Sequence, residues 1–137
     1  MITFNYETDF FIKEEKRISN WIENIILNNS FELAEVNYIF CDDAYLLNLN
    51  IEFLKHDTLT DIISFDNTIG RLIGGDIFIS IERIIENAKI FKVSFNEELY
   101  RVMIHGVLHF LGYKDKTPLE KKAMRNKEDE SLLLLNN

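Results

Sequence analysis

The most informative stretch of this chain is His105-Gly-Val-Leu-His109-Phe-Leu-Gly112-Tyr-Lys-Asp115. On a helix, where successive residues turn by about 100°, the spacing of the two histidines places both imidazoles on one face, about one turn apart. Gly112 can adopt the left-handed conformation that ends a helix and redirects the chain. Two histidines on a helix and a third ligand on the returning chain are typical of catalytic zinc sites, which keep one position open. The stretch therefore predicts a metal site formed by His105, His109 and Asp115.

The residue after the first histidine argues against one class of zinc enzyme. The spacings of four, seven and ten residues from His105 are those of the elongated zinc-protease motif, in which a Glu follows the first histidine as general base. Here that position is Gly106. We therefore expect no peptidase activity, and we expect Gly106 to let another segment or the substrate approach the helix closely.

The third ligand has two alternatives from the residues alone. His56 is the only other histidine and competes with Asp115 for this role. Asp115 could also orient an imidazole without binding the ion. As a ligand, a carboxylate makes the site harder than three imidazoles would, so the expected ion is one Zn²⁺, with Mn²⁺ or another divalent metal tolerated.

The composition indicates a single domain over residues 1–137. Of the 137 residues 47% are hydrophobic, and one proline and five glycines provide no flexible linker. The apolar runs fall short of the ~20 residues that cross a bilayer, and the N-terminus lacks the basic and apolar regions of a signal peptide. The lone Cys41 excludes an internal disulfide and fits a reducing compartment. We therefore expect a cytoplasmic protein without membrane contact.

The charge argues against a protein that coats nucleic acid non-specifically, because the net charge is −8 and phosphate binding needs Lys and Arg. A local basic groove can still lie on an acidic body. The last predicted helix carries Lys121, Lys122 and Arg125 between acidic residues. This pattern is typical of a solvated face, and its functional alternative is a contact for rRNA or a ribosomal protein.

Hydrophobic periodicity predicts four strands and five helices. Strands are expected over residues 2–6, 35–41, 60–65 and 76–81, the last reached through a turn at Gly74-Gly75. Helices are expected over 11–28, from an Asp42 or Asp43 cap to about 54, over 82–91, from a Ser94 or Asn96 cap through the histidines, and from Thr117-Pro118 onward. This order predicts an α+β domain with a mixed four-stranded sheet, helices packed on it and a metal-binding helix lining a cleft.

Three motifs carry a resemblance to a known family. They are His105-Gly-x-x-His109-x-x-Gly112-Tyr113, then Leu49-Asn50 with Phe53 and Asp57-x-x-Thr60-Asp61-Ile-Ile-Ser64-Phe65, and Gly75-Asp76-Ile77 before a strand. In this order, over nearly the whole chain, they resemble the YbeY endoribonucleases, which are bacterial rRNA maturation factors. The resemblance implies a three-ligand zinc site in a cleft, cleavage of single-stranded RNA, 16S rRNA 3′-end maturation and ribosome quality control.

The resemblance also assigns residues and partners. It implies His105, His109 and the residue at 115 as ligands, although Asp115 stands where the family usually has a third His. Leu54 and His56 stand where the family commonly has Arg and Lys. The implied partners are rRNA and ribosomal particles, with no DNA expected.

Metal-assisted phosphodiester hydrolysis is the expected chemistry. Lys55 and His56 are candidates for stabilising phosphate charge, and Asp61 is a candidate catalytic residue whose alternative is a structural hydrogen bond. Two other functions remain open from the sequence. One is a metallohydrolase of another phosphoester, and the other is a non-catalytic ribosome-assembly factor whose metal only stabilises the fold.

Overall fold

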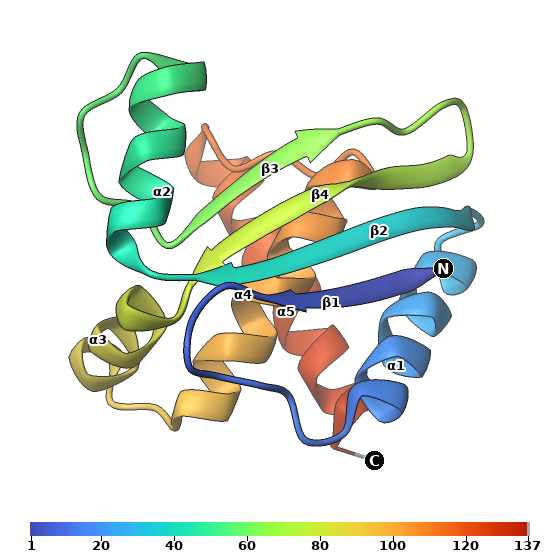
Figure 1. Cartoon of the computed structure of the whole chain (residues 1–137). Coiled ribbons are helices and arrows are strands. Elements are labelled where there is room, and N and C mark those ends of the chain that lie inside the picture. The colour runs from blue at the N-terminus through green and yellow to red at the C-terminus, as the bar shows by residue number, and fades with distance from the viewer. Residues whose placement is uncertain (137) are drawn as a thin grey trace.

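The computed structural model describes residues 1–136 and contains an open mixed sheet with helices packed on it (Figure 1). In chain order the elements are β1 Ile2–Tyr6, α1 Glu15–Asn28, β2 Glu32–Cys41, α2 Asp43–Leu49, a π-helical turn Asn50–Leu54, β3 Ile62–Asp66, β4 Leu72–Ser80, α3 Ile81–Phe91, α4 Phe95–Phe110 and α5 Pro118–Leu135. This confirms the predicted α+β class and the predicted order. No helix within residues 1–136 is long and apolar enough to cross a membrane.

The sheet has the strand order β1-β2-β4-β3. β1, β2 and β4 are parallel, and β3 pairs with β4 in the antiparallel direction. The short strands β1 and β3 therefore form the edges, and β4 is a central strand, as its apolar sequence predicts.

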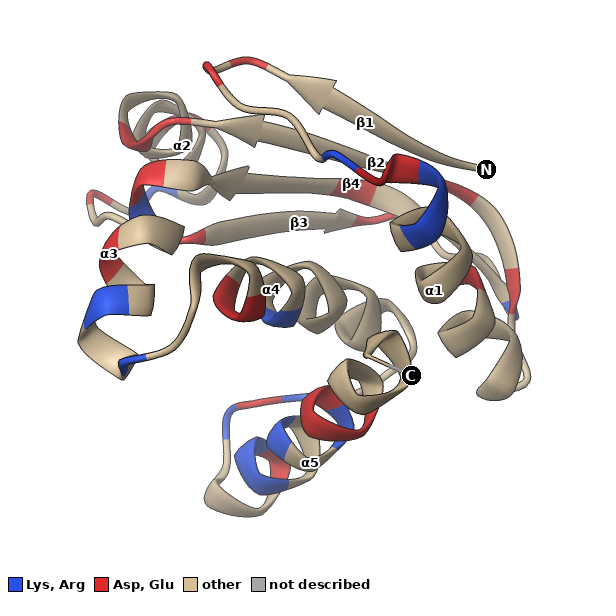
Figure 2. Cartoon of the chain, turned by 90° about the horizontal axis from the view of Figure 1, so that it is seen from below, with Lys and Arg blue, Asp and Glu red and all other residues tan. Residues whose placement is uncertain are grey.

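The two faces of the sheet are covered by different helices. α1, α4 and α5 gather on one face (Figures 1 and 2), where side chains such as Tyr38, Ile77 and Ile79 form the main core. The other face carries a small cluster around Cys41, Leu46 and Ile63, to which α2 contributes Leu46. β4 thus alternates between two apolar layers, as expected of a central strand.

α4 is the buried helix of the main layer. It begins at the Ser94 cap, whose side chain accepts a hydrogen bond from the Glu97 amide. The buried hydroxyl of Tyr38 donates to the Met103 carbonyl oxygen at 2.8 Å and ties α4 to β2. A Cβ on Gly106 would lie 2.9 Å from Ile77 Cδ1 and 3.2 Å from Ile62 Cδ1. Gly106 therefore lets the helix and the sheet approach closely, one of the two roles expected for it.

The structure differs from the predicted elements at several boundaries, of which three concern a turn or a helix start. Gly74 and Gly75 lie inside β4, and the preceding turn is made near Gly70, whose φ is +59°. Phe11 and Ile12 precede α1, because the chain becomes helical only after Glu14. Ile81 is the first residue of α3 and not the last of the strand, since Ser80 caps that helix.

The place of Gly75 inside β4 has a packing reason. A Cβ at this position would lie 2.7 Å from Cζ of Phe110 on α4 and would also clash with the Phe65 carbonyl oxygen. The absent side chain lets the end of α4 lie against the sheet, so this glycine serves packing and not a turn.

We expect Gly75→Ala to lower the free energy of unfolding by about 2 kcal/mol, because overpacking displaces a ring or the backbone. Gly74→Ala is the matched control, since its Cβ would lie 3.3 Å from the Glu35 carbonyl oxygen, with no aromatic ring in the way. Urea denaturation of both variants measures the difference. Equal losses in the two variants would contradict this account of Gly75.

Candidate metal centre

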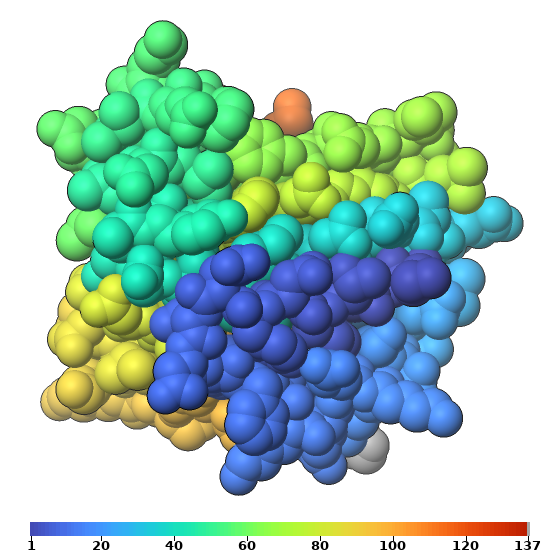
Figure 3. All heavy atoms as spheres, in the orientation of Figure 1, coloured from blue at the N-terminus to red at the C-terminus, as the bar shows by residue number. Residues whose placement is uncertain are grey.

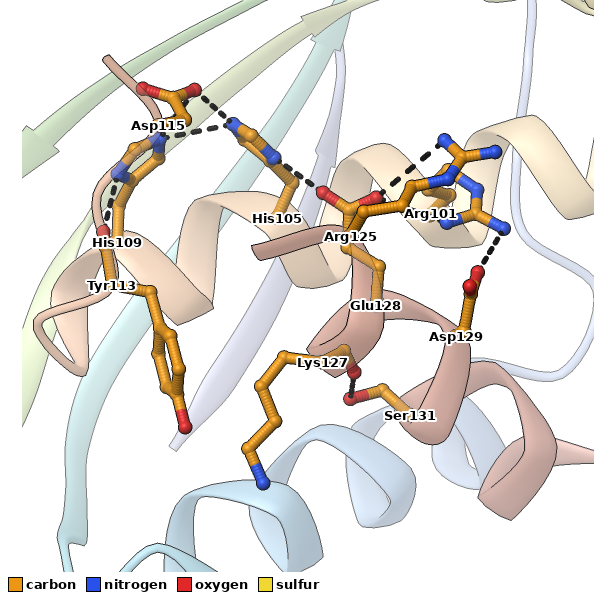
Figure 4. Close-up of polar contacts among 10 residues, drawn as sticks. All are labelled: Arg101, His105, His109, Tyr113, Asp115, Arg125, Lys127, Glu128, Asp129 and Ser131. Atoms are coloured by element: carbon orange, nitrogen blue, oxygen red, sulfur yellow. Dashed lines mark hydrogen bonds and ion pairs between the residues drawn. The ribbon is translucent and has the colours of Figure 1, made fainter. Parts of the chain in front are cut away.

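The end of α4 brings the predicted ligands together (Figure 4). After Phe110 the Gly112 and Tyr113 amides donate to the carbonyl oxygens of His109 and Leu108, each at 3.0 Å. Gly112 has a φ of +106°, a conformation that a side chain would disfavour. The chain therefore turns back and carries Asp115 to the two imidazoles, before α5 begins at its Thr117 cap.

Three ligand atoms form a small triangle. His105 Nε2 and His109 Nε2 lie 3.0 Å apart, and Asp115 Oδ2 lies 3.3 Å from each of them. Zinc ligands at about 2.0–2.2 Å from the ion lie about 3.3 Å from one another in a tetrahedron. Within residues 1–136 this is the one group of three or more His, Cys, Asp or Glu side chains close enough to hold a metal ion.

The hydrogen bonds of the imidazoles determine which nitrogen is free. His105 Nδ1 lies 2.7 Å from Glu128 Oε2, and His109 Nδ1 lies 2.9 Å from the Tyr113 carbonyl oxygen. Because these oxygens accept, each Nδ1 donates, and each Nε2 then presents a lone pair to the triangle. Two lone pairs and a carboxylate oxygen at this separation repel one another unless a cation lies among them. The donor set therefore fits a divalent metal ion.

Glu128 on α5 is a site residue that the sequence analysis missed. Its side chain is 7% exposed and accepts from Arg101 Nη1 at 3.0 Å as well as from His105. Arg101 also pairs with Asp129 at 2.8 Å. Arg101 thus positions the carboxylate that positions His105. The available signal was the buried stripe of α5, where Glu128 takes a core position between Met124 and Leu132.

The electrostatic field at His105 favours positive charge. Burial alone lowers the pKa of this imidazole, but the hydrogen bond and charge of Glu128 raise it, as do the charges of Asp115 and Asp61. The net effect is a raised pKa, so the surroundings stabilise a cation at this position, whether a proton or a metal ion.

A small acidic cavity of about 300 Å³ opens beside the triangle. Its lining includes His105, Asp115, Asp61 and Glu98. Burial raises the pKa of Asp61, although Asn87 Nδ2 donates to it at 3.4 Å. Burial also raises the pKa of Glu98, which precedes His105 by two helical turns. The cavity therefore places two proton-accepting groups next to the candidate ligands.

The other two predicted catalytic residues lie elsewhere on the surface. Lys55 and His56 are exposed, on the connection between the π-helical turn and β3. Lys55 adopts a left-handed conformation with φ 59°. This region projects as a lobe at the upper left of Figure 3, and neither residue lines the cavity beside the triangle.

Glu98→Gln should stabilise the protein at neutral pH. Because the folded-state pKa of Glu98 is raised, its contribution to stability is complete below the unfolded value of about 4.3 and is lost as pH rises through the folded value. Glutamine carries no charge, so the variant should melt at a higher temperature near pH 7 and at an equal temperature near pH 4. Thermal unfolding of chelator-treated protein measures this.

The control for this variant is Glu97→Gln. Glu97 is exposed in the first turn of α4, where its charge faces the positive end of the helix dipole. We expect a small loss of stability at neutral pH. A Glu98 variant that behaves like the Glu97 variant would show that burial does not govern the Glu98 carboxyl.

Glu128→Gln should weaken metal binding about 10- to 100-fold, because the amide is a poorer hydrogen-bond acceptor for the His105 Nδ1–H. Glu130→Gln on the same helix is the control, since Glu130 is exposed and pairs with Lys127. Competition with a chromogenic chelator gives both affinities. Unchanged affinity in the Glu128 variant would exclude a positioning role for this carboxylate.

Comparisons with known proteins identify the family of this chain. The family model described as "Endoribonuclease YbeY" matches residues 3–136. The chain is 60% identical to Endoribonuclease YbeY of Flavobacterium psychrophilum and 54% identical to that of Flavobacterium johnsoniae, in both cases over 98% of this chain and 96% of the relative. The solution structure of TM1509 from Thermotoga maritima superposes with a TM-score of 0.72 at 27% identity, over 98% of this chain and 89% of that chain. The chain therefore belongs to the YbeY endoribonuclease family.

Proposed function

We propose that this protein is a metal-dependent endoribonuclease that cleaves single-stranded RNA, in 16S rRNA 3′-end maturation and ribosome quality control. Membership of the endoribonuclease family supports hydrolysis of RNA. The observation that carries the metal dependence is the triangle of His105 Nε2, His109 Nε2 and Asp115 Oδ2, with both imidazoles held in the tautomer that a ligand needs.

One divalent ion would be held by His105, His109 and Asp115. Zn²⁺ suits two imidazoles and a carboxylate, and the carboxylate also admits Mn²⁺. Such an ion supplies Lewis-acid polarisation of a phosphate oxygen and activation of water.

The residues of the chain have their own tasks in this proposal. Glu128 and the Tyr113 carbonyl fix the two imidazoles. Asp61, in the cavity that includes His105 and Asp115, would accept a proton, and burial raises the pKa of its carboxyl above the usual value. Lys55 and His56, exposed on the lobe before β3, would contact phosphate charge of an RNA strand outside the cavity.

The proposed partners are rRNA and ribosomal particles in the cytoplasm, without DNA or membrane. Lys121, Lys122 and Arg125 are exposed on α5, where they can contact rRNA or a ribosomal protein. The net charge of −8 makes a local basic surface necessary for such binding.

The test is cleavage of a labelled single-stranded RNA by the purified, untagged protein, with metal content measured on the same samples. We expect about one equivalent of metal and cleavage that a chelator abolishes and Zn²⁺ or Mn²⁺ restores. His109→Ala and Asp115→Ala should lose both the metal and at least about 100-fold in rate. Glu130→Ala, which removes an exposed carboxylate of α5 that pairs with Lys127 and lies outside the triangle and its hydrogen-bond network, is the control and should keep the metal.

Two results would contradict the proposal. Chelation that lowers the melting temperature, with no chelator-sensitive cleavage of RNA by the parent protein, would favour the non-catalytic assembly factor. Metal-dependent hydrolysis of small phosphoesters without cleavage of RNA would favour the other metallohydrolase.

A further inference from the structure

A second cavity, of about 420 Å³, adjoins the triangle of candidate ligands. Its lining is formed by His109, Asp115, Lys114, Lys116, Thr117 and Glu120. Of the three candidate ligands, His105 and Asp115 line the acidic cavity, whereas His109 and Asp115 line this one. Asp115 therefore belongs to both, and the candidate metal position has an acidic side and a side with two lysines.

The lysine side belongs to the most basic segment of an acidic chain. Six of the fifteen Lys and Arg residues lie between positions 114 and 127, and the same segment holds only two acidic residues, Asp115 and Glu120. Figure 2 shows these blue segments along the connection before α5 and along the first turns of that helix. Two of these residues, Lys114 and Lys116, line the cavity beside the candidate metal ligands, and the other four lie on α5.

The two lysines are available to a ligand. Both are exposed, and within residues 1–136 neither has a carboxylate in ion-pair contact, whereas Lys127 is paired with Glu130 at 3.1 Å. Lysine ammonium groups on flexible stems bind phosphate as point charges and need no fixed geometry. They therefore suit a polymer that presents phosphates of varying position.

Within residues 1–136 Glu120 has no ion-pair contact with either lysine, although the hydrogen bond from the Thr117 amide and the charge of Lys114 lower the pKa of its carboxyl. Its carboxylate accepts hydrogen bonds from the amides of Lys116 and Thr117, at 3.2 and 2.9 Å, in the capping box of α5. Its carboxylate is thus committed to the backbone, while the two lysines flank Asp115 in the sequence and line the same cavity.

We propose that Lys114 and Lys116 form a phosphate-binding subsite that holds the backbone of a single-stranded RNA next to the metal position. The proposal rests on the proposed function and assigns the RNA contact to the connection that carries the third ligand. The occupant is a phosphodiester of the RNA chain, because two exposed lysines line the cavity beside the metal position and further exposed basic residues, Lys121, Lys122 and Arg125, follow on α5. Recognition is by charge and is independent of sequence.

The test compares Lys114→Gln/Lys116→Gln with a control that loses the same charge. Lys13→Gln/Lys16→Gln is suitable, because Lys13 lies with Phe95 at the opposite end of α4. Each zinc-loaded protein is titrated against a 2′-O-methyl single-stranded oligonucleotide at several salt concentrations, after its metal content has been checked. Because a metal-activated water does not need the 2′-OH, gel analysis after each titration checks that the strand is intact, so that binding is measured separately from cleavage.

We expect the slope of log K against log salt to become less steep by about 1.4 in the Lys114/Lys116 variant, with a roughly 20-fold loss of affinity at 0.1 M salt. The control should keep the parental slope, and both variants should keep the parental metal content. An unchanged slope in the Lys114/Lys116 variant, or an equal change in the control, would overturn the subsite.

Two arms separate this inference from its alternatives. Inorganic phosphate could stabilise the parent against thermal unfolding but not the Lys114/Lys116 variant, while both proteins bind RNA equally. In that case the cavity binds free phosphate, and the RNA subsite is wrong. If the metal-loaded parent does not bind RNA at all, the proposed function fails with it. If the parent binds and cleaves RNA and the Lys114/Lys116 variant binds RNA with the same affinity and salt dependence, only the subsite is wrong and the proposed function stands.

Discussion

At the end of α4, three atoms that carry lone pairs and repel one another are held close together. The two imidazole Nε2 atoms and the Asp115 oxygen lie 3.0–3.3 Å apart, a separation that only a cation among them makes favourable. The fold opposes this repulsion by holding each imidazole through a hydrogen bond to its Nδ1 atom. His105 is held by Glu128 and Arg101 and His109 by the Tyr113 carbonyl, and the turn after α4 carries Asp115 to them. The packing of α4, α5 and the connection between them therefore has to be rigid for the site to exist.

That rigidity is built from apolar contacts on one side of α4 and polar contacts on the other. Gly106 brings the helix close to Ile77 of β4, while Arg101 and His105 face Glu128 of α5. The charged groups are nearly buried, which would be costly if they were unpaired. Each has a partner: Arg101 contacts Glu128, and Glu128 contacts His105, which would hold the metal. The same hydrogen bonds therefore stabilise the packing of α4 on α5 and orient a candidate metal ligand.

The parts of the site that are local in sequence could be predicted, and the parts that depend on tertiary packing could not. His105, His109 and Asp115 fall within one helical stretch and its turn, so spacing alone brings them together. Glu128 lies 23 residues from His105, and nothing in its neighbourhood says which helix it faces. The glycine pair at 74 and 75 predicts a turn, and the packing role of Gly75 depends on the Phe110 ring of α4 and the Phe65 carbonyl oxygen, which its own sequence neighbourhood does not indicate.

The placement of the third ligand links folding to metal supply. Two candidate ligands lie on α4 and the third on the connection that leads into α5, so an ion bound there would join the two helices. Such an ion would act as a removable crosslink between them. At a free concentration of 100 times its dissociation constant it would add about 2.7 kcal/mol to the folded state. The amount of stable protein in a cell would then depend on the metal available there, before any question of catalysis arises.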